Sequence, residues 1–214
     1  MKVFDLPPAT EFGKVVPKNA FDKYTNSKQK KMMSDSIQRI RWINKLSPKT
    51  TNLPSKHIEE IQVFSVELKY KNDIPTILNI IQRVIPYHIV FILQYEEEIK
   101  ISTAAKHLNP SLKDTAVLDF TLESSWYYQN ENTLQINLTR SIDWVFVDFC
   151  CQLLGREKVY QNYTTFLEKE KEVQDIQKKI AVLQKKIKQE KQFKKKVVLN
   201  SELNEFKLLL RSLV

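Results

Sequence analysis

The chain has 214 residues, of which 42% are hydrophobic and 10% aromatic, and its formal net charge is +9 at pH 7. This composition excludes a disordered chain, and the length allows one buried core of roughly 150 residues plus an extended appendage. No apolar run reaches the roughly 18 residues that a membrane-spanning helix needs, and the N-terminus lacks the apolar core of a signal peptide, so we expect no membrane contact.

The N-terminal quarter of the chain predicts an extended arm followed by one helix. Prolines and a glycine punctuate residues 1–23, a composition typical of an arm that lies over another part of the protein. From Ser27 to Leu46 apolar residues recur at helical spacing, which predicts a helix over this segment. Ser47-Pro48 is expected to end the helix, because proline disfavours helical geometry at the residue before it.

The next segment predicts a β-α-β unit. Residues 61–69 are rich in β-forming side chains, which indicates a strand. A helix is expected to begin at Asn72-Asp73 and to end before Pro86. The continuous apolar run over 89–93 is typical of a strand that is covered on both faces. A β-α-β order with a short connection predicts a parallel strand pair with a right-handed crossover.

Three more strands and a helix complete the predicted domain. The strands are expected over 99–104, 117–122 and 133–138. Ser141 is predicted to cap a helix that Gly155 closes. We therefore predict an α/β (α+β) fold, with a single mixed-sheet domain of about five strands and flanking helices over residues 1–155.

The tail, residues 156–214, predicts a helical coiled-coil hairpin. Its first apolar series follows the three- and four-residue steps of a heptad seam if Lys169 is accepted into it. That series is Phe166, Val173, Ile176, Ile180, Leu183 and Ile187. A second series is Leu199, Leu203, Phe206, Leu210 and Leu213. Because it is offset by about two residues, whereas a simple stutter gives three or four, we expect a break near 196–200, with Asn200 or Ser201 capping a second helix.

Most of the net charge lies in this tail. Between residues 178 and 196, nine lysines stand against one acid, Glu190, which gives +8 of the chain's +9. The nine are Lys178, Lys179, Lys185, Lys186, Lys188, Lys191, Lys194, Lys195 and Lys196. Lysines that face phosphates gain affinity by releasing counterions, so this face is a candidate surface for DNA or RNA. A coiled coil that docks a protein partner and a merely solvated face are the alternatives.

Glu67 and Lys69 suggest a catalytic alternative. Nucleases of the PD-(D/E)xK type place a Glu-x-Lys on a strand, where the carboxylate binds Mg²⁺ and the lysine assists the attacking water. Strand alternation puts Glu67 and Lys69 on one face, as this chemistry requires. The nearest acids, Glu59 and Glu60, lie on the same segment, so a further acid from a preceding strand is missing. Mg²⁺ is expected only under this alternative.

Other patterns point away from a bound cofactor or metal. The chain has two glycines, too few for a phosphate-binding glycine loop. Its histidines, His57, His88 and His107, lie far apart without ligand-like spacing, so we predict no metal site. The only cysteines, Cys150 and Cys151, are adjacent and therefore poorly placed for a structural disulfide, which predicts a reducing, cytoplasmic location.

Five further residues are candidates for a site because they lie at element boundaries or among aromatic residues. They are Lys18, Lys45, Arg83, Lys106 and Trp126. Site residues often lie at such boundaries, although a surface cation is the plainer interpretation of each basic residue. Trp126 begins a Trp-Tyr-Tyr run in which strand alternation must turn some rings outward, where they can stack on bases.

Several short stretches form an ordered set along the chain. They are Val16-Pro17-Lys18 with Phe21, residues 40–48 with 51–53, 63–69, 85–91, 190–193 and 197–203. In this order they resemble a bacterial and archaeal family catalogued as domain of unknown function 4391. The family's central Ala-Tyr-Lys stretch is Ala104-Ala105-Lys106 here, so its tyrosine is absent. The family has no established activity, but its members are often encoded beside helicases and DNA methyltransferases in restriction-like or phage-defence clusters, and the resemblance therefore implies nucleic-acid work in a larger complex.

These observations favour a non-catalytic accessory subunit of a bacterial DNA-processing or phage-defence complex. We expect its basic C-terminal helix to contact nucleic acid or a helicase- or methyltransferase-like protein. The alternatives are a Mg²⁺-dependent nuclease that uses Glu67 and Lys69, and a structural homodimer formed through the coiled coil.

Overall fold

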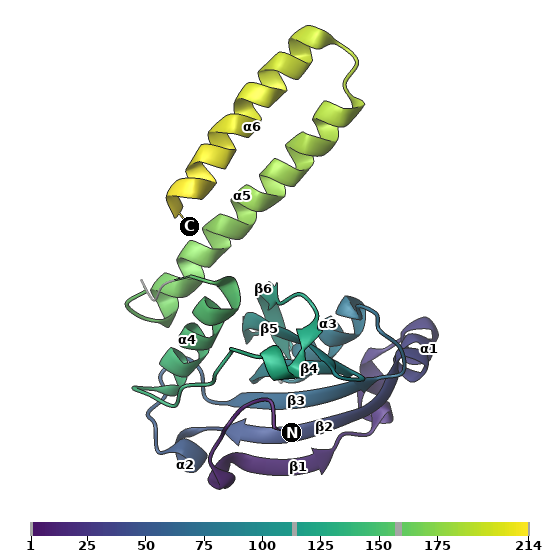
Figure 1. Cartoon of the computed structure of the whole chain (residues 1–214), viewed down its shortest axis with the longest axis vertical. Coiled ribbons are helices and arrows are strands. Elements are labelled where there is room, and N and C mark those ends of the chain that lie inside the picture. The colour runs from purple at the N-terminus through teal and green to yellow at the C-terminus, as the bar shows by residue number, and fades with distance from the viewer. Residues whose placement is uncertain (1, 113–114, 157–159, 214) are drawn as a thin grey trace. The chain divides into compact units, whose positions relative to one another are not determined.

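The computed structural model describes residues 2–112, 115–156 and 160–213, which form two compact units. The first unit, Met1–Tyr163, contains a β-sheet with helices packed on it, and the second, Thr164–Val214, is helical (Figure 1). The mixed α/β class predicted from the sequence is therefore confirmed. None of the helices in the described part of the chain has the length and the apolar character that crossing a membrane requires.

A mixed sheet of seven strands forms the centre of the first unit. Its strands are β1 (Glu11–Val15), β2 (Ile37–Leu46), β3 (Ile61–Leu68), β4 (His88–Tyr95), β5 (Glu98–Leu108), β6 (Ala116–Glu123) and β7 (Tyr127–Tyr128). The first six lie side by side in chain order, and β7 pairs with the start of β5. As predicted, β3 and β4 run parallel, whereas the other described pairs are antiparallel. The sheet has more strands than the sequence predicted.

Helices flank this sheet. They are α1 (Ser27–Ser36), α2 (Pro48–Thr51), α3 (Pro75–Val84) and α4 (Ile142–Leu154), with short 3₁₀ turns η1 (Pro8–Thr10), η2 (Lys18–Tyr24) and η3 (Gln129–Glu131). The predicted helix between the parallel strands is α3, which begins with Pro75, where a missing N–H leaves no helical hydrogen bond unmade. Its Ile77 and Ile81 belong to the same buried cluster as Phe64 of β3 and Phe91 of β4.

The opposite face of the sheet carries α4. Ile89 of β4 belongs to the core beneath α3, and its neighbour His88 points to the other face, because successive strand residues point to opposite faces. On that face the ring centroid of His88 lies 4.6 Å from the ring centroid of Phe146 in α4. The Ser141 side chain accepts a backbone N–H of the first turn of α4 at 3.1 Å, and Gly155 closes the helix with a φ of 63°. Both predicted ends of this helix are confirmed.

The predicted helix over 27–46 is wrong in its second half. The helix α1 ends at Ser36, and the strand β2 follows it and lies between β1 and β3. Register shifts interrupt the pairing of β2 with β3 at two places. Such bulges add a residue to the strand, so the buried Ile37 and Ile40 are three positions apart, a spacing that imitates a helix.

The predicted arm over 1–23 has regular structure. It contains β1, which pairs with β2, and the turns η1 and η2. Near its start, the ring of Phe4 packs edge-on against Phe149 of α4 at 5.6 Å. The arm is thus part of the folded first unit.

The predicted strand over 133–138 is also wrong, since these residues are all described and none lies in a strand. Amide side chains form the hydrogen bonds to this segment's backbone that a neighbouring strand would otherwise have formed. Asn132 bonds the C=O and N–H of Leu134 at 3.1 and 3.3 Å, and Gln152 bonds both groups of Gln135 at 2.9 Å. Side chains therefore replace the sheet ladder in this segment.

The C-terminal helices are α5 (Tyr163–Gln189) and α6 (Phe193–Leu213), which lie side by side as a hairpin (Figure 1). Members of the predicted seam are buried, namely Val173, Ile176, Leu183 and Leu203. Lys169, which the heptad pattern places in this seam, is exposed, and Glu170 is buried instead. Residues three and four positions before Val173 lie on either side of the seam, so either can turn inward.

The break between the two helices lies at 190–192, ahead of the predicted 196–200. Glu190 follows α5, and its Oε1 accepts the next two backbone N–H groups at 2.8 and 2.9 Å. The helix α6 continues through Asn200, whose Nδ2 donates to the backbone carbonyl four residues earlier at 2.8 Å. Asn200 therefore does not cap a helix, and the offset between the apolar series comes from the short connection.

Candidate functional site

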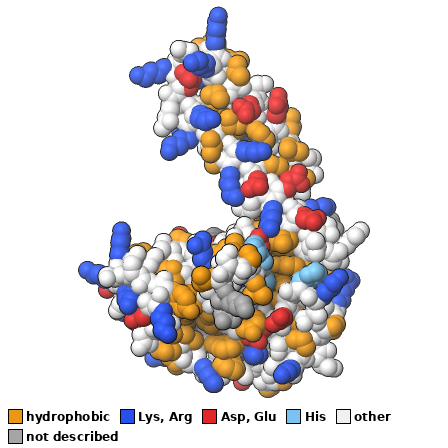
Figure 2. All heavy atoms as spheres, turned by 180° about the vertical axis from the view of Figure 1, so that it is seen from behind, with side chains coloured by type: hydrophobic (Ala, Val, Ile, Leu, Met, Phe, Trp, Pro, Cys, Tyr) orange, Lys and Arg blue, Asp and Glu red, His pale blue; other side chains and the backbone are white. Residues whose placement is uncertain are grey.

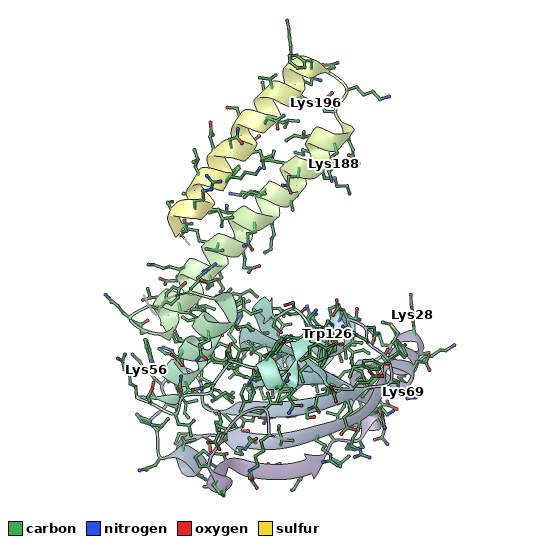
Figure 3. The ribbon with its side chains drawn as sticks, viewed as in Figure 1. Lys28, Lys56, Lys69, Trp126, Lys188 and Lys196 are labelled. Atoms are coloured by element: carbon green, nitrogen blue, oxygen red, sulfur yellow. The ribbon has the colours of Figure 1, made fainter. Side chains whose placement is uncertain are left out.

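The nine lysines lie on the second half of α5, in the connection and on the first turn of α6, and we call this set the lysine surface. Figure 2 shows the blue lysine and arginine side chains on one face of the hairpin. Lys196 is half-buried and the other eight are exposed; Lys188 and Lys196 mark the surface in Figure 3. Lys178 lies 3.1 Å from Asp175, and the remaining eight have no ion-pair partner among the described residues. The charge of this surface is therefore largely uncompensated within the hairpin.

The one acid within the lysine surface is directed toward the backbone. The N–H groups of Gln192 and Lys191 bond the Glu190 carboxylate, and these hydrogen bonds lower its pKa. Glu190 thus stays ionised while it holds the connection between the helices, and it leaves the lysine side chains free of an ion pair. A positive potential over this end of the hairpin follows from the arrangement.

A hollow of about 770 Å³ lies between the two helices at the lysine surface. Lys186, Lys194 and Lys195 line it together with Val198 and Leu199. Phe193, which is not among the lining residues, begins α6 with 79% of its surface exposed. An exposed aromatic ring among lysines is the arrangement by which proteins stack unpaired bases and bind their phosphates.

Glu67, the candidate metal ligand, has no acidic neighbour across the strands. In the described sheet its cross-strand partners are Arg39 on β2, whose Nη1 lies 3.9 Å from its Oε1, and Gln94 on β4. Neither β2 nor β4 contains an aspartate or a glutamate. Lys69 lies beyond the end of β3, where it is exposed and its N–H donates to the Ser36 carbonyl at 2.9 Å.

Glu67 also lines a cavity of about 370 Å³, together with Glu11 of β1. The register pairs Glu11 with Asn44 and Asn44 with Val63, four residues from Glu67 on β3. Their α-carbons are thus separated by roughly 13 Å along the strands and about 10 Å across them, too far for one metal ion to be shared. Among the described residues, no group of three histidine, cysteine, aspartate or glutamate side chains is placed to hold a metal ion.

Three of the other candidates have structural partners. Lys18 donates to the Ile37 carbonyl at 2.9 Å, which ties η2 to β2. Lys45 lies 2.7 Å from the buried carboxylate of Glu60. Trp126 is partly buried against the main core and donates through Nε1 to an aspartate at 3.3 Å, whereas Tyr128 of the same run is 53% exposed. Arg83 is exposed on the last turn of α3.

Lys106 is buried, with 3% of its surface exposed. Its Nζ donates to the backbone carbonyls of Gln82 at 2.7 Å and Ile85 at 2.8 Å. These carbonyls belong to the end of α3, where helical partners run out, so the amine caps the helix. Burial lowers the pKa of Lys106 well below its ordinary value, and a neutral amine still offers two N–H groups for the two carbonyls.

The structure brings together three histidines that the sequence keeps apart. His57 precedes β3, His88 begins β4 and His107 lies near the end of β5, and all three line one pocket of about 240 Å³, the histidine pocket. Parallel strands begin at the same edge of a sheet, and the antiparallel β5 ends there, which explains the convergence. The predicted β-α-β unit already implied that the residues at the starts of its two strands lie close together. The spacing of the histidines along the chain, taken alone, did not reveal this, and the pocket was therefore not predicted.

His88 is the buried member of the histidine pocket. Its Nε2 lies 3.2 Å from the Tyr163 hydroxyl. Burial, assisted by the charge of Lys106, lowers the pKa of His88 to about 3, so its ring is neutral at physiological pH. Burial likewise raises the pKa of Tyr163, which keeps its proton. At the rim, His107 places Nδ1 3.1 and 3.2 Å from the two carboxylate oxygens of Asp119.

The fold and these side chains define a mixed α/β protein with a basic, helical C-terminal unit. The chain belongs to the family described as domain of unknown function (DUF4391), whose sequence model matches residues 4–210. The resemblance carried by the ordered stretches is confirmed. No curated protein and no solved structure matches the chain. Its function is therefore argued from its own surfaces and pockets.

Proposed function

We propose that the protein is a non-catalytic accessory subunit of a DNA-processing or phage-defence complex, and that its lysine surface binds nucleic acid. The observation that carries the proposal is the local charge of +8 between residues 178 and 196. Of the nine lysines in this segment, one has an acidic partner among the described residues. Phosphate backbones complement such a surface without any reading of base sequence.

The physical signature of this binding is its dependence on salt. Each lysine that neutralises a phosphate releases a condensed counterion, which lowers the slope of log K against log salt by about 0.9 for duplex DNA and about 0.7 for a single strand. Replacing five contacting lysines therefore flattens the slope by roughly 3.5 to 4.5. A decrease in affinity without a change of slope is not expected from this mechanism.

The exposed Phe193 favours an unpaired strand over a duplex. Bases in a duplex are stacked on each other, whereas those of a single strand are free to stack on an aromatic ring, a contact of about 1–3 kcal/mol. Phe193 directly precedes Lys194 and Lys195 on α6, and its ring is exposed. We therefore expect tighter binding to a single-stranded oligonucleotide than to its duplex.

The test compares two variants of equal charge. The first replaces lysines of the hairpin with glutamine, at Lys185, Lys186, Lys194, Lys195 and Lys196. The second replaces exposed lysines of the sheet unit, at Lys23, Lys28, Lys31, Lys49 and Lys56. Fluorescence anisotropy with a labelled oligonucleotide at several salt concentrations should show loss of affinity and a flatter slope for the first variant alone.

The competing outcomes contradict the proposal in different ways. Equal losses in both variants indicate a general effect of net charge rather than a surface. Unchanged nucleic-acid binding in the hairpin variant, combined with loss of a co-purifying helicase- or methyltransferase-like protein, assigns the lysine surface to a protein partner. If the hairpin variant binds both nucleic acid and the protein partner as wild type does, the lysine surface has neither of these roles and the proposal is wrong.

A further inference from the structure

We propose that the histidine pocket binds an uncharged planar heterocycle of the nucleobase class. The inference rests on the geometry of the sheet unit and is independent of the lysine surface. It extends the proposed function from phosphates, which the lysines attract, to a base, which lysines do not recognise. Pockets for drug-sized ligands measure roughly 300–1,000 Å³, and the histidine pocket, at about 240 Å³, suits a single ring system.

The charges of the buried groups around the pocket are balanced or suppressed. Glu60 is paired with Lys45 at 2.7 Å and accepts from Gln62 at 2.6 Å. The Lys106 amine is engaged by two carbonyls of α3, and His88 is neutral. The carbonyl end of α3 adds negative potential, which disfavours an anion such as phosphate. An uncharged ligand therefore fits better than an anion, and the exposed carboxylate of Glu59 in the lining adds to this preference.

His88 presents a ring nitrogen that no hydrogen bond among the described residues uses. The side chain is 6% exposed, its Nε2 faces the Tyr163 hydroxyl, and its Nδ1 has no hydrogen-bond partner among the described residues. The neutral ring carries one donor and one acceptor nitrogen, and the Tyr163 hydroxyl can pair with either kind at Nε2. Nδ1 is therefore the nitrogen left for a ligand, and a nucleobase offers both donors and acceptors to it.

Polar groups stand at the rim of the same pocket. His107 places Nδ1 within 3.2 Å of both Asp119 carboxylate oxygens, which leaves Nε2 as the ring nitrogen available to a ligand. The Glu59 carboxylate is exposed and also lines the pocket. Nucleobases are neutral and planar, and they carry ring or carbonyl acceptors next to amino or imino donors. The apolar part of the wall, with Tyr87 and Leu108, suits the faces of such a ring.

The experiment uses the full chain and nucleosides, which lack phosphate. Adenosine, guanosine, cytidine and uridine are titrated while the imidazole NMR signals of the three histidines are followed, with ribose 5-phosphate as the comparison. We expect at least one nucleoside to shift all three sets of signals with a single binding curve, and ribose 5-phosphate to shift none. His107→Ala and Glu59→Gln, both at exposed positions, should weaken that nucleoside roughly fivefold or more, as loss of one hydrogen bond requires.

The controls separate this proposal from the lysine surface. The five-glutamine hairpin variant should bind the nucleoside as wild type does, whether or not it still binds an oligonucleotide. Tyr70→Ala, at an exposed site outside the pocket, is the matched control within the sheet unit and should also leave nucleoside binding unchanged. The proposal is overturned if no nucleoside shifts the histidine signals at saturation, if ribose 5-phosphate binds as well as the nucleosides, or if the rim variants bind unchanged.

Discussion

Lys106→Met tests whether the buried amine holds the end of α3. Methionine has a similar unbranched length but no N–H group, so the substitution leaves the carbonyls of Gln82 and Ile85 without the donors that now lie at 2.7 and 2.8 Å. Two lost hydrogen bonds of about 1 kcal/mol each, and the desolvation of carbonyls left buried, give a deficit of about 2–4 kcal/mol in the free energy of unfolding at about pH 10, where folding requires little loss of protons from the amine. For a unit of this size that corresponds to roughly 4–16 °C in Tm.

The deficit should depend on pH in a defined direction. Burial lowers the pKa of Lys106 in the folded state well below the ordinary 10.5 that applies in the unfolded chain. Between these two values the unfolded chain binds more protons, so wild-type stability rises with pH and this contribution is fully present above 10.5. Since methionine does not titrate, the gap between wild type and Lys106→Met should widen from neutral pH toward about pH 10.

Chemical denaturation followed by circular dichroism at several pH values measures both effects. Arg83→Met is the matched control, because Arg83 is exposed on the last turn of the same helix, and its cost should stay within about 0.5 kcal/mol. Equal stability of Lys106→Met and wild type at about pH 10, or a gap that narrows as pH rises toward that value, would refute the assignment of Lys106 as the cap of α3.

Three further predictions address the other parts of the molecule. Asp143→Asn should destabilise the first unit by about 2–4 kcal/mol in denaturant, because the buried carboxylate accepts three backbone N–H groups of residues 56–58 at 2.7–3.1 Å; an unchanged midpoint would contradict this. Phe193→Ala should lower single-strand affinity by about 1–3 kcal/mol in anisotropy and spare the duplex, and equal losses would remove the stacking role. Wild-type protein should not cleave DNA with Mg²⁺ or Mn²⁺, and cleavage that disappears in Glu67→Ala would establish the nuclease alternative.

The parts of the fold that local pattern controls were predictable from the sequence. The β3–α3–β4 unit follows from a continuous apolar strand, a helix with an apolar face and a proline in its first turn. The cap and end of α4 follow from Ser141 and Gly155. In each case the residues that determine the structure are neighbours in the sequence, and tertiary contacts reinforce the local preference.

The errors occur where distant residues decide the outcome. In β2 the bulges arise from pairing with β3, and they convert the two-residue alternation into a three-residue spacing. In 133–138 the deciding group is Gln152, which lies on α4 and occupies the backbone of Gln135. The histidine pocket escaped prediction for the same reason, since His57, His88 and His107 meet only once the strands are assembled.

The surroundings of Glu67 bear on whether the sheet unit carries metal chemistry of its own. A carboxylate that shares Mg²⁺ needs further oxygen ligands from neighbouring strands, whereas Glu67 has a guanidinium on one side and an amide on the other. A guanidinium offers donors only, and it competes with a cation for the same carboxylate. The acids that the described part of the sheet unit does bury, Glu60, Asp143 and Asp148, are likewise committed to a lysine, to backbone N–H groups and to amide side chains. These acidic side chains therefore serve to hold the structure, and none of the three joins Glu67 in the cluster of oxygen ligands that the nuclease alternative requires.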